Sequence, residues 1–305
     1  MTLALLSVRC LLLALLFSMP AAFARETLPT LELQSSLADT VRPELVYWQN
    51  DTEPPIYQPG QELDVASMAP WQPLPELWDT PRYNTNNVWF AFSITNASSR
   101  IRTLMLAYNY ARMDEMDLYL VKNNIVQERW ITGSERPWES RAIPNANFVF
   151  PVTLSTGDSI NVVIRTTGRS SYFPKYWSVS DIASWQRYHE LTQLPSLIAL
   201  GFMLCIIVYS AVLLHALRTV VSLCAFIYLV ALTLLLLWIS GNVWLISPEF
   251  NENNRLAAIA VGTAISAMVF LLIDLLEMRK TFPRIARLLT FYTVIYFATY
   301  LFRPP

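Results

Sequence analysis

The chain has 305 residues and a formal net charge of -1, with 15% charged and 54% hydrophobic residues. Its mean hydropathy of +0.35 is too high for an ordinary soluble protein. The balanced charge, with no basic patch among the aromatic residues, excludes a nucleic-acid-binding surface of the usual kind. Apolar residues concentrate after residue 190, which predicts an exported domain over 25–190 and a transmembrane region over 191–305.

The first 24 residues have the pattern of a cleaved signal peptide. Arg9 supplies a positive charge, Cys10–Phe17 form a short apolar core, and Ala22–Ala24 match the small-x-small motif before a cleavage site. A membrane anchor is the alternative, but the apolar core is shorter than the roughly 17–25 residues that span a bilayer. Residues 25–190, which contain no cysteine, are therefore predicted to lie in a bacterial periplasm.

The exported region contains short alternating patterns that are typical of an antiparallel β-sandwich. In the segment 88–94 the even-numbered positions are apolar and are expected to face the core. Residues 116–131 are predicted to form a hairpin that turns at Asn123 and Asn124. The segments 148–154 and 160–164 are predicted to pair with each other as a second hairpin.

A Pro-rich stretch, residues 50–78, precedes these strands. It contains Trp71 and Trp78, two large aromatic side chains that favour burial. We therefore expect this stretch to wrap around the sandwich rather than to act as a flexible linker.

Four apolar segments predict an all-α membrane bundle after the sandwich, with helices near 195–217, 220–239, 256–276 and 286–302. The fourth segment is only marginally long enough to span a bilayer. Basic residues concentrate in the first and third loops, whereas the loop between the second and third helices carries acidic residues. The positive-inside rule then places the first and third loops in the cytoplasm and the N-terminal domain outside, in a multi-pass protein of the bacterial inner membrane.

Eight tryptophans in the exported region make a sugar-binding surface conceivable, because aromatic rings pack against the apolar faces of sugars. Arginines in the same region can also donate two hydrogen bonds to a carboxylate. The alternative is that these tryptophans belong to the core and that the arginines pair with nearby acids. The candidate ligand-binding residues are Trp89, Trp130, Arg136, Trp138 and Arg141.

Catalytic and metal-binding motifs are missing from the sequence. The two histidines, His189 and His215, lie beside and within the apolar helices, and the exported region has no cysteine. There is no phosphate-binding Gly-rich loop, no Ser/His/Asp grouping, and no kinase or cyclase motif. The sequence therefore predicts neither an enzyme nor a protein with a metal or another cofactor.

Several stretches resemble the bacterial 7TMR-DISM family, the seven-transmembrane receptors with diverse intracellular signalling modules. The resemblance to the family's type-2 extracellular domain covers most of 40–180 and rests on "VWFAFSITN" (88–96), "MDEMDLYLV" (113–121), the segment 132–154, and "VVIRTTGRSS" (162–171). It implies a jelly-roll-like sandwich similar to carbohydrate-binding modules, which senses a small ligand. The family's usual seven helices precede a cytoplasmic kinase or cyclase, so the four helices predicted here lead us to expect a truncated or split receptor that lacks its own output domain.

The resulting functional hypothesis is a membrane sensor that binds a small molecule or sugar outside and conveys binding through its helices. The segment 178–195 is the expected coupler, with Trp185 and Tyr188 as anchors. Expected partners are the lipid bilayer, the ligand, a separate signalling protein and a second copy of the chain in a homodimer. The alternative is a non-signalling subunit that presents a binding surface to a separate signalling protein.

Overall fold

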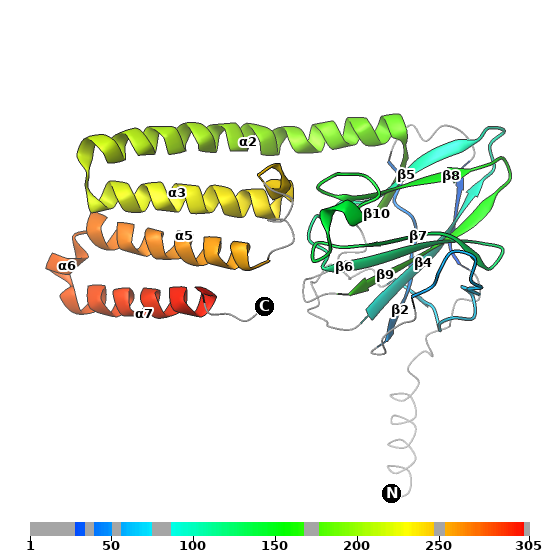
Figure 1. Ribbon diagram of the computed structural model, residues 1–305, viewed down its shortest axis with the longest axis horizontal. Coiled ribbons are helices and arrows are strands. Elements are labelled where there is room, and N and C mark those ends of the chain that lie inside the picture. The colour runs from blue at the N-terminus through cyan, green and yellow to red at the C-terminus, as the bar shows by residue number, and fades with distance from the viewer. Residues whose placement is uncertain are drawn as a thin grey trace, which may run out of the picture.

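The computed structural model describes two regions joined end to end, a β-sandwich and a group of helices (Figure 1). The described residues are 28–33, 40–50, 56–74, 87–167, 177–246 and 254–301. The predicted signal peptide, Trp78 and the last four residues lie outside them.

The larger sheet has the strand order β3-β2-β4-β9-β6-β7, and β1 also pairs with β4. The β1–β4 pair is parallel and the other pairs are antiparallel. Its strands are β1 (Thr30–Leu33), β2 (Val46–Asn50), β3 (Gln72–Pro73), β4 (Asn87–Asn96), β6 (Glu115–Lys122), β7 (Ile125–Thr132) and β9 (Ser159–Thr167).

The smaller sheet has the order β10-β5-β8, with β5 at Arg102–Tyr108, β8 at Phe148–Leu154 and β10 at Trp177–Asp181. The main hydrophobic core contains alternate residues from both sheets, as expected for a two-sheet sandwich. The inward positions predicted for 88–94, 116–120, 148–154 and 160–164 are confirmed, because their apolar side chains all belong to this core.

The hairpin between β6 and β7 turns where the sequence predicts. Asn123 and Asn124 have φ angles of 52° and 60°. Two successive residues with positive φ form a type I′ turn, whose twist matches the twist of the paired strands. Asparagine tolerates this left-handed conformation better than most residues, which explains the choice of both side chains.

The predicted pairing of 148–154 with 160–164 is wrong. β8 pairs with β5 in the smaller sheet, whereas β9 pairs with β4 and β6 in the larger sheet. The turn between β8 and β9 therefore carries the chain from one sheet to the other. Alternation identifies the inward face of each strand, but it does not identify the neighbouring strand, because both sheets face the same core.

The segment 56–74 covers part of the outer face of the larger sheet. Trp71 is 2% exposed, and its Nε1 donates a 2.6 Å hydrogen bond to the carbonyl oxygen of Val65. Together with Leu63, these residues belong to a second apolar cluster on this face. The expectation that this segment wraps the sandwich is confirmed for the residues described.

The helical region begins without a loop after β10. Within the described residues, three helices are long and apolar enough to cross a membrane: α2 (Ile182–Leu217), α3 (Val220–Ile239) and the stretch Leu256–Leu275 of α5 (Asn254–Leu275). A short 3-10 turn, η3 (Asn242–Leu245), follows α3. The short α6 (Met278–Thr281) precedes α7 (Pro283–Leu301), which forms where the fourth helix is predicted but does not qualify as a span.

Helix α2 begins at Ile182, earlier than the predicted start near residue 195. Proline is common in the first turn of helices, so Pro195 resembles a start, but here it lies inside the helix. With 36 residues, α2 is about 54 Å long at about 1.5 Å per residue, which exceeds the roughly 30 Å thickness of the hydrocarbon core. Its first turns can therefore lie outside the membrane.

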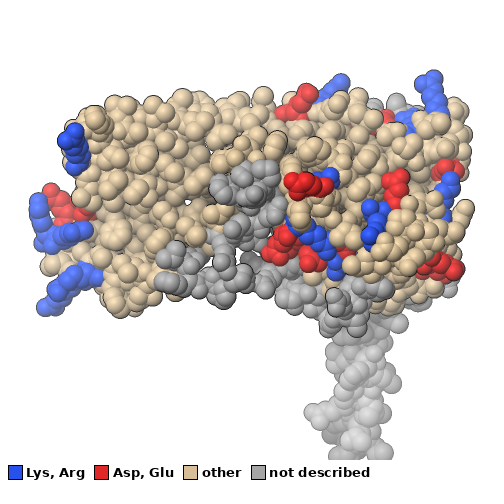
Figure 2. Space-filling model, viewed as in Figure 1, with Lys and Arg blue, Asp and Glu red and all other residues tan. Residues whose placement is uncertain are grey.

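Charge is distributed unevenly along the helical region. Lys and Arg side chains gather at the end of the helices that lies away from the sandwich (Figure 2). The α2–α3 turn at this end contains Arg218, and the segment from α6 to the start of α7 contains Arg279 and Lys280. This arrangement has the sandwich and the basic loops at opposite ends of the helices, as the positive-inside rule requires for an extracellular sandwich.

Candidate functional site

One row of side chains on the outer face of the larger sheet changes from apolar to polar from strand to strand. Strand register places Trp48, Trp89, Arg165 and Asp117 in one row across β2, β4, β9 and β6. Successive side chains of a strand alternate between faces, so this row points away from the main core. One row therefore brings together two tryptophans at one end and an arginine–aspartate pair at the other.

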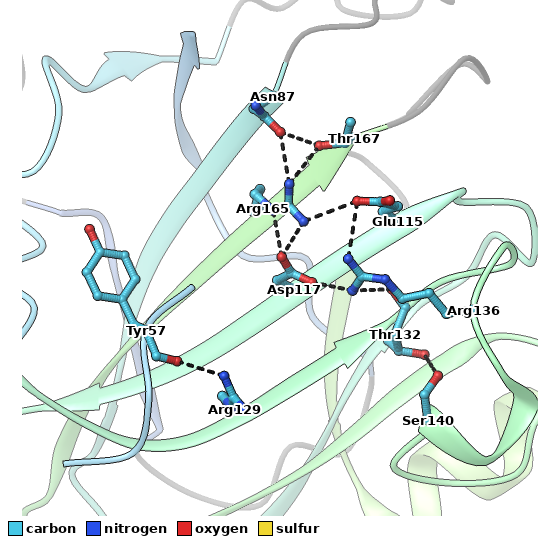
Figure 3. A network of polar contacts seen from close by, with 10 residues as sticks. All are labelled: Tyr57, Asn87, Glu115, Asp117, Arg129, Thr132, Arg136, Ser140, Arg165 and Thr167. Carbon is cyan, nitrogen blue, oxygen red and sulfur yellow. Dashed lines mark hydrogen bonds and ion pairs between the residues drawn. The ribbon is translucent and has the colours of Figure 1, made fainter. Parts of the chain in front are cut away.

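Two arginines and two acids form an ion-pair network at the polar end of this face (Figure 3). The Asp117 side chain is fully buried and accepts hydrogen bonds from Arg165, at 2.6 Å from Nε, and from Nη1 of Arg136. Glu115 Oε2 accepts from Nη2 of both arginines, at 3.2 Å each. The two positive and two negative charges balance, which compensates for removing Asp117 from water.

Neutral groups complete the network at the ends of β4 and β9. Arg165 Nη1 donates to Asn87 Oδ1 at 3.0 Å and to Thr167 Oγ1 at 3.3 Å. Arg136 Nη1 also donates to the carbonyl oxygen of Thr132 at 3.3 Å. These bonds fix the planes of both guanidinium groups (Figure 3).

A close contact between backbones positions Arg136. At Gly133, a Cβ atom would lie 2.1 Å from the carbonyl oxygen of Asp114, so a larger residue does not fit. The next two amides, of Ser134 and Glu135, donate to the carbonyl oxygens of Met113 and Asp114. The chain after β7 is thereby held against the start of β6, where Arg136 reaches the acids.

The network offers a small polar rim to solvent. The Glu115 side chain is 40% exposed and the Arg136 side chain is 20% exposed, whereas Asp117 is fully buried. An exposed guanidinium can donate to a carboxylate, and an exposed carboxylate can accept from hydroxyl groups. The rim is chemically suited to a small acid or a sugar. Among the residues described, no group of three or more His, Cys, Asp or Glu side chains could hold a metal ion.

Alternation along 88–94 assigns Trp89, a candidate ligand contact, to the outward face of its strand, but the side chain is not exposed there. Its side chain is 1% exposed and stacks on Tyr119 with ring centroids 6.4 Å apart. Both belong to the apolar cluster that includes Trp71 of the covering segment. The strand face assigned to Trp89 is right, but residues 56–74 cover that face.

Trp130 lies elsewhere, against the main core. It is partly buried, and its ring centroid lies 5.5 Å from that of Phe150. The structure therefore does not bring Trp130 together with Trp89, which lies on the opposite face of the larger sheet.

Trp138 and Arg141 lie where the sandwich meets the helical region. The Trp138 ring stacks on Trp244 of η3, with centroids 5.2 Å apart and an interplanar angle of 19°. The Arg141 guanidinium lies between the rings of Trp138 and Phe148, at 4.4 and 4.2 Å from their centroids. Burial, and then the nearby charge of Arg112, lowers the pKa of Arg141 to about 9, so the group stays charged at neutral pH.

A second contact between the two regions involves Arg112 and Trp238, the latter in α3. Arg112 Nε donates a 2.7 Å hydrogen bond to the carbonyl oxygen of Trp238, and the guanidinium lies 4.3 Å from the centroid of its ring. Burial lowers the pKa of Arg112 to about 10. The sandwich therefore presents two buried arginines, Arg112 and Arg141, to the outer end of the helices.

The predicted coupling residues occupy the first turns of α2. Trp185 packs against the outer face of the smaller sheet, near Met105 and Val149. Its ring also stacks on His189, which makes a 3.1 Å contact with the side-chain amide of Asn145. Tyr188 is 42% exposed on the same helix. Trp185 thus contacts the sandwich directly.

The sequence did not predict most of the residues that meet in the ion-pair network and at the contact between the sandwich and the helices. Arg165, Asp117 and Glu115 meet only through the register of β6 and β9, which no local pattern reports. Arg112 and Trp238 are 126 residues apart. The alternation of apolar residues in 160–164 does place Arg165 on the outward face of its strand, and this signal could have identified Arg165 as a member of the network.

Comparison with known protein families identifies part of the chain. The family model of the 7TMR-DISM extracellular 2 domain matches residues 58–176, which include β3 to β9 and the whole ion-pair network. No curated protein matches the chain. The matched family consists of sensory, non-catalytic domains. In the described part of the chain, the matched residues are followed by three helices that are apolar enough to span a membrane. Residues 58–176 therefore resemble a 7TMR-DISM extracellular 2 domain, and together with the apolar helices they support a receptor-like membrane protein whose N-terminal domain lies outside the membrane.

Proposed function

We propose that this protein is a membrane receptor whose sandwich binds a small ligand and conveys binding to the membrane helices. The observation that carries the proposal is the junction between Asp181, the last residue of β10, and Ile182, the first residue of α2. Because no loop separates this strand from a candidate membrane span, a displacement of the smaller sheet passes directly to that helix.

The proposed ligand site is the rim formed by Arg136 and Glu115. Its chemistry favours a small ligand with carboxylate and hydroxyl groups, of which sugar acids are an example. A ligand carboxylate would share the guanidinium of Arg136, while Asp117 stays buried and holds both arginines in place. Carbohydrate binding also agrees with the jelly-roll-like sandwich expected for this family.

To convey ligand binding, β10 and the first turns of α2 must be held firmly against the smaller sheet. Asp181 forms a 3.2 Å ion pair with Arg102 of β5, and Trp185 packs against the same sheet one helical turn later. A ligand that favours one arrangement of the sheets would shift the population of α2 orientations by its difference in affinity.

The proposed setting is the inner membrane of a bacterium, with several spans and the sandwich in the periplasm. The signal-peptide pattern, the cysteine-free exported region and the basic loops at the far end of the helices support this setting. In this setting the partners would be the lipid bilayer, a second copy of the chain and a separate signalling protein.

A thermal-shift screen tests the ligand part of the proposal. The full chain in lipid nanodiscs would be melted with sugar acids, the matching neutral sugars and small carboxylic acids. A ligand at 100 times its Kd stabilises the folded state by about 2.7 kcal/mol, which raises the melting temperature measurably. We expect a sugar acid or a small acid to raise the melting temperature.

Two arginine variants show whether the rim is responsible. Arg136→Gln should abolish the shift, whereas Arg129→Gln should retain it, because Arg129 bonds to the carbonyl oxygen of Tyr57 outside the network. Equal shifts in both variants would contradict the proposed site. A bound ligand that leaves the hydrogen exchange of α2 unchanged would instead favour a non-signalling binding subunit.

A further inference from the structure

The loop between β7 and β8, residues 133–147, contributes to both the ion-pair network and the contact between the sandwich and the helices. Arg136 reaches the ion-pair network beside β6, and Trp138, two residues later, stacks on Trp244 of η3. Ser140 closes the loop by donating a 3.1 Å hydrogen bond to the side chain of Thr132. Only one residue separates Arg136 from Trp138, so the two contacts share one short stretch of backbone.

The helical side of this contact is a tight turn between α3 and η3. Gly241 has a φ angle of 73°, which favours glycine. A Cβ atom at this position would lie 2.4 Å from the Cβ of Ala111 and 3.3 Å from that of Ala146. Trp238 and Trp244, on either side of this turn, contact Arg112 and Trp138. The turn therefore fits against two loops of the sandwich at once.

The contact is small and specific rather than a shared hydrophobic core. Among the described residues, the apolar clusters of the sandwich include a single helix side chain, Trp185. The other contacts include cation–aromatic and aromatic–aromatic contacts and a polar one, the 3.1 Å contact between Asn145 and His189 of α2. Domains joined by contacts of this kind are able to move relative to each other.

We propose that the segment Trp238–Trp244 is a docking surface that holds the sandwich in one orientation, and that the loop 133–147 couples ligand binding at Arg136 to docking at Trp244. This mechanism rests on the proposed receptor function. It adds a second route into the membrane region beside α2, one that ends on α3 and η3. A ligand that moves Arg136 weakens or strengthens the Trp138–Trp244 stack and so changes the docked population.

Gly241→Ala tests docking directly, because its methyl group collides with Ala111 while both cores remain intact. Gly157→Ala is a matched control: Gly157 also has a positive φ, 76°, but a Cβ atom there meets nothing within 4 Å. Hydrogen–deuterium exchange would be measured on residues 138–146 of the full chain in nanodiscs. We expect exchange to become about tenfold faster in Gly241→Ala and to be unchanged in Gly157→Ala.

Unchanged exchange in Gly241→Ala would overturn the docking surface, and so would an equal increase in Gly157→Ala. Trp244→Ala provides a second variant if Gly241→Ala fails to fold, since Trp244 is only partly buried on a turn, and it should also accelerate exchange in residues 138–146. These measurements need no ligand. A failed ligand screen with intact docking would therefore count against the proposed function alone.

The coupling step has its own readout. When a compound that raises the melting temperature in the screen is added, the hydrogen-exchange rate of residues 138–146 in the unmodified protein should change by at least about threefold. In Gly241→Ala, the compound should still raise the melting temperature but no longer change exchange in this loop. Binding with no effect on the loop of the unmodified protein would overturn the coupling.

Discussion

Arg112 of the sandwich donates a 2.7 Å hydrogen bond to the backbone carbonyl of Trp238, at the outer end of α3. A carbonyl near a helix C-terminus is a natural acceptor for a cation, because the helix dipole places partial negative charge there. This carbonyl also accepts a 3.1 Å hydrogen bond from the backbone amide of Gly241. The same guanidinium lies over the Trp238 ring. One side chain thus binds both the backbone and the aromatic ring of a residue in the membrane region.

Replacing Arg112 should weaken docking measurably. Arg112→Gln removes a charged hydrogen bond, worth about 1.5–3 kcal/mol, together with a cation–aromatic contact of about 0.5–2 kcal/mol. A double-mutant cycle with Trp238→Leu, read by hydrogen exchange of residues 138–146, isolates the aromatic part, because the backbone carbonyl remains in Trp238→Leu. Strictly additive effects would show that the guanidinium gains nothing from the ring.

The ion-pair network should respond unequally to loss of its two acids. Asp117→Asn leaves two guanidinium groups with one partly exposed carboxylate, and we expect a loss of about 3–5 kcal/mol in the free energy of unfolding of the sandwich. Glu115→Gln should cost about 1 kcal/mol or less, because its side chain is 40% exposed. Melting followed by tryptophan fluorescence compares the two, and equal losses would contradict the assignment of Asp117 as the buried centre.

Trp89 should behave as a core residue rather than as a ligand platform. Trp89→Ala empties space between Tyr119 and the covering segment 56–74, and large-to-small changes of this kind cost about 3–5 kcal/mol. The melting temperature should fall strongly even without any ligand. A variant that melts normally but no longer binds a compound from the screen would instead support the original expectation of a sugar platform.

Tyr119 makes the sandwich sensitive to high pH. Burial, and then the carboxylate of Asp117, raises the pKa of Tyr119 from 10.0 to about 12. Between these values the unfolded chain loses the phenolic proton while the folded sandwich keeps it, so stability is complete below pH 10 and falls as pH rises toward 12. Urea unfolding at several pH values should show this loss, and Tyr119→Phe should lose less stability over the same interval.

The sequence predicts facing directions well and strand neighbours poorly. The inward positions of β4, β6, β8 and β9 follow from alternation, which is a local property of each strand. Whether β8 pairs with β9 or with β5 depends on contacts between distant segments, and the prediction failed there. The turn at Asn123 and Asn124 succeeded because its conformation depends on adjacent residues.

The candidate site shows the same division. Arg136 was predicted from its residue type, but its partners Asp117 and Arg165 required the β6–β9 register. Trp89 was assigned the right strand face, yet burial depended on a covering segment that arrives from earlier in the chain. Trp138 and Arg141 were chosen as candidate ligand contacts. In the structure, Trp138 stacks on Trp244 of η3 and the Arg141 guanidinium lies over the Trp138 ring, and no spacing pattern in the sequence indicates these contacts.

The most direct test of the account is a cross-link between the sandwich and the η3 turn. Glu139→Cys and Leu245→Cys introduce thiols beside Trp138 and Trp244 without removing either ring. The three native cysteines, Cys10, Cys205 and Cys224, are replaced by serine. A short bis-maleimide would be added to intact membranes. The control pair is Glu139→Cys with Arg218→Cys, because α3 separates Arg218 from the sandwich by about 30 Å.

The account predicts an intrachain cross-link for the 139–245 pair and none for the 139–218 pair. Single-cysteine chains should react with a membrane-impermeant maleimide at 139 and 245, since both positions would lie outside the membrane. Cross-linking of the 139–218 pair, or labelling of both thiols in the 139–245 pair without any cross-link, would contradict a sandwich docked on the outer end of α3.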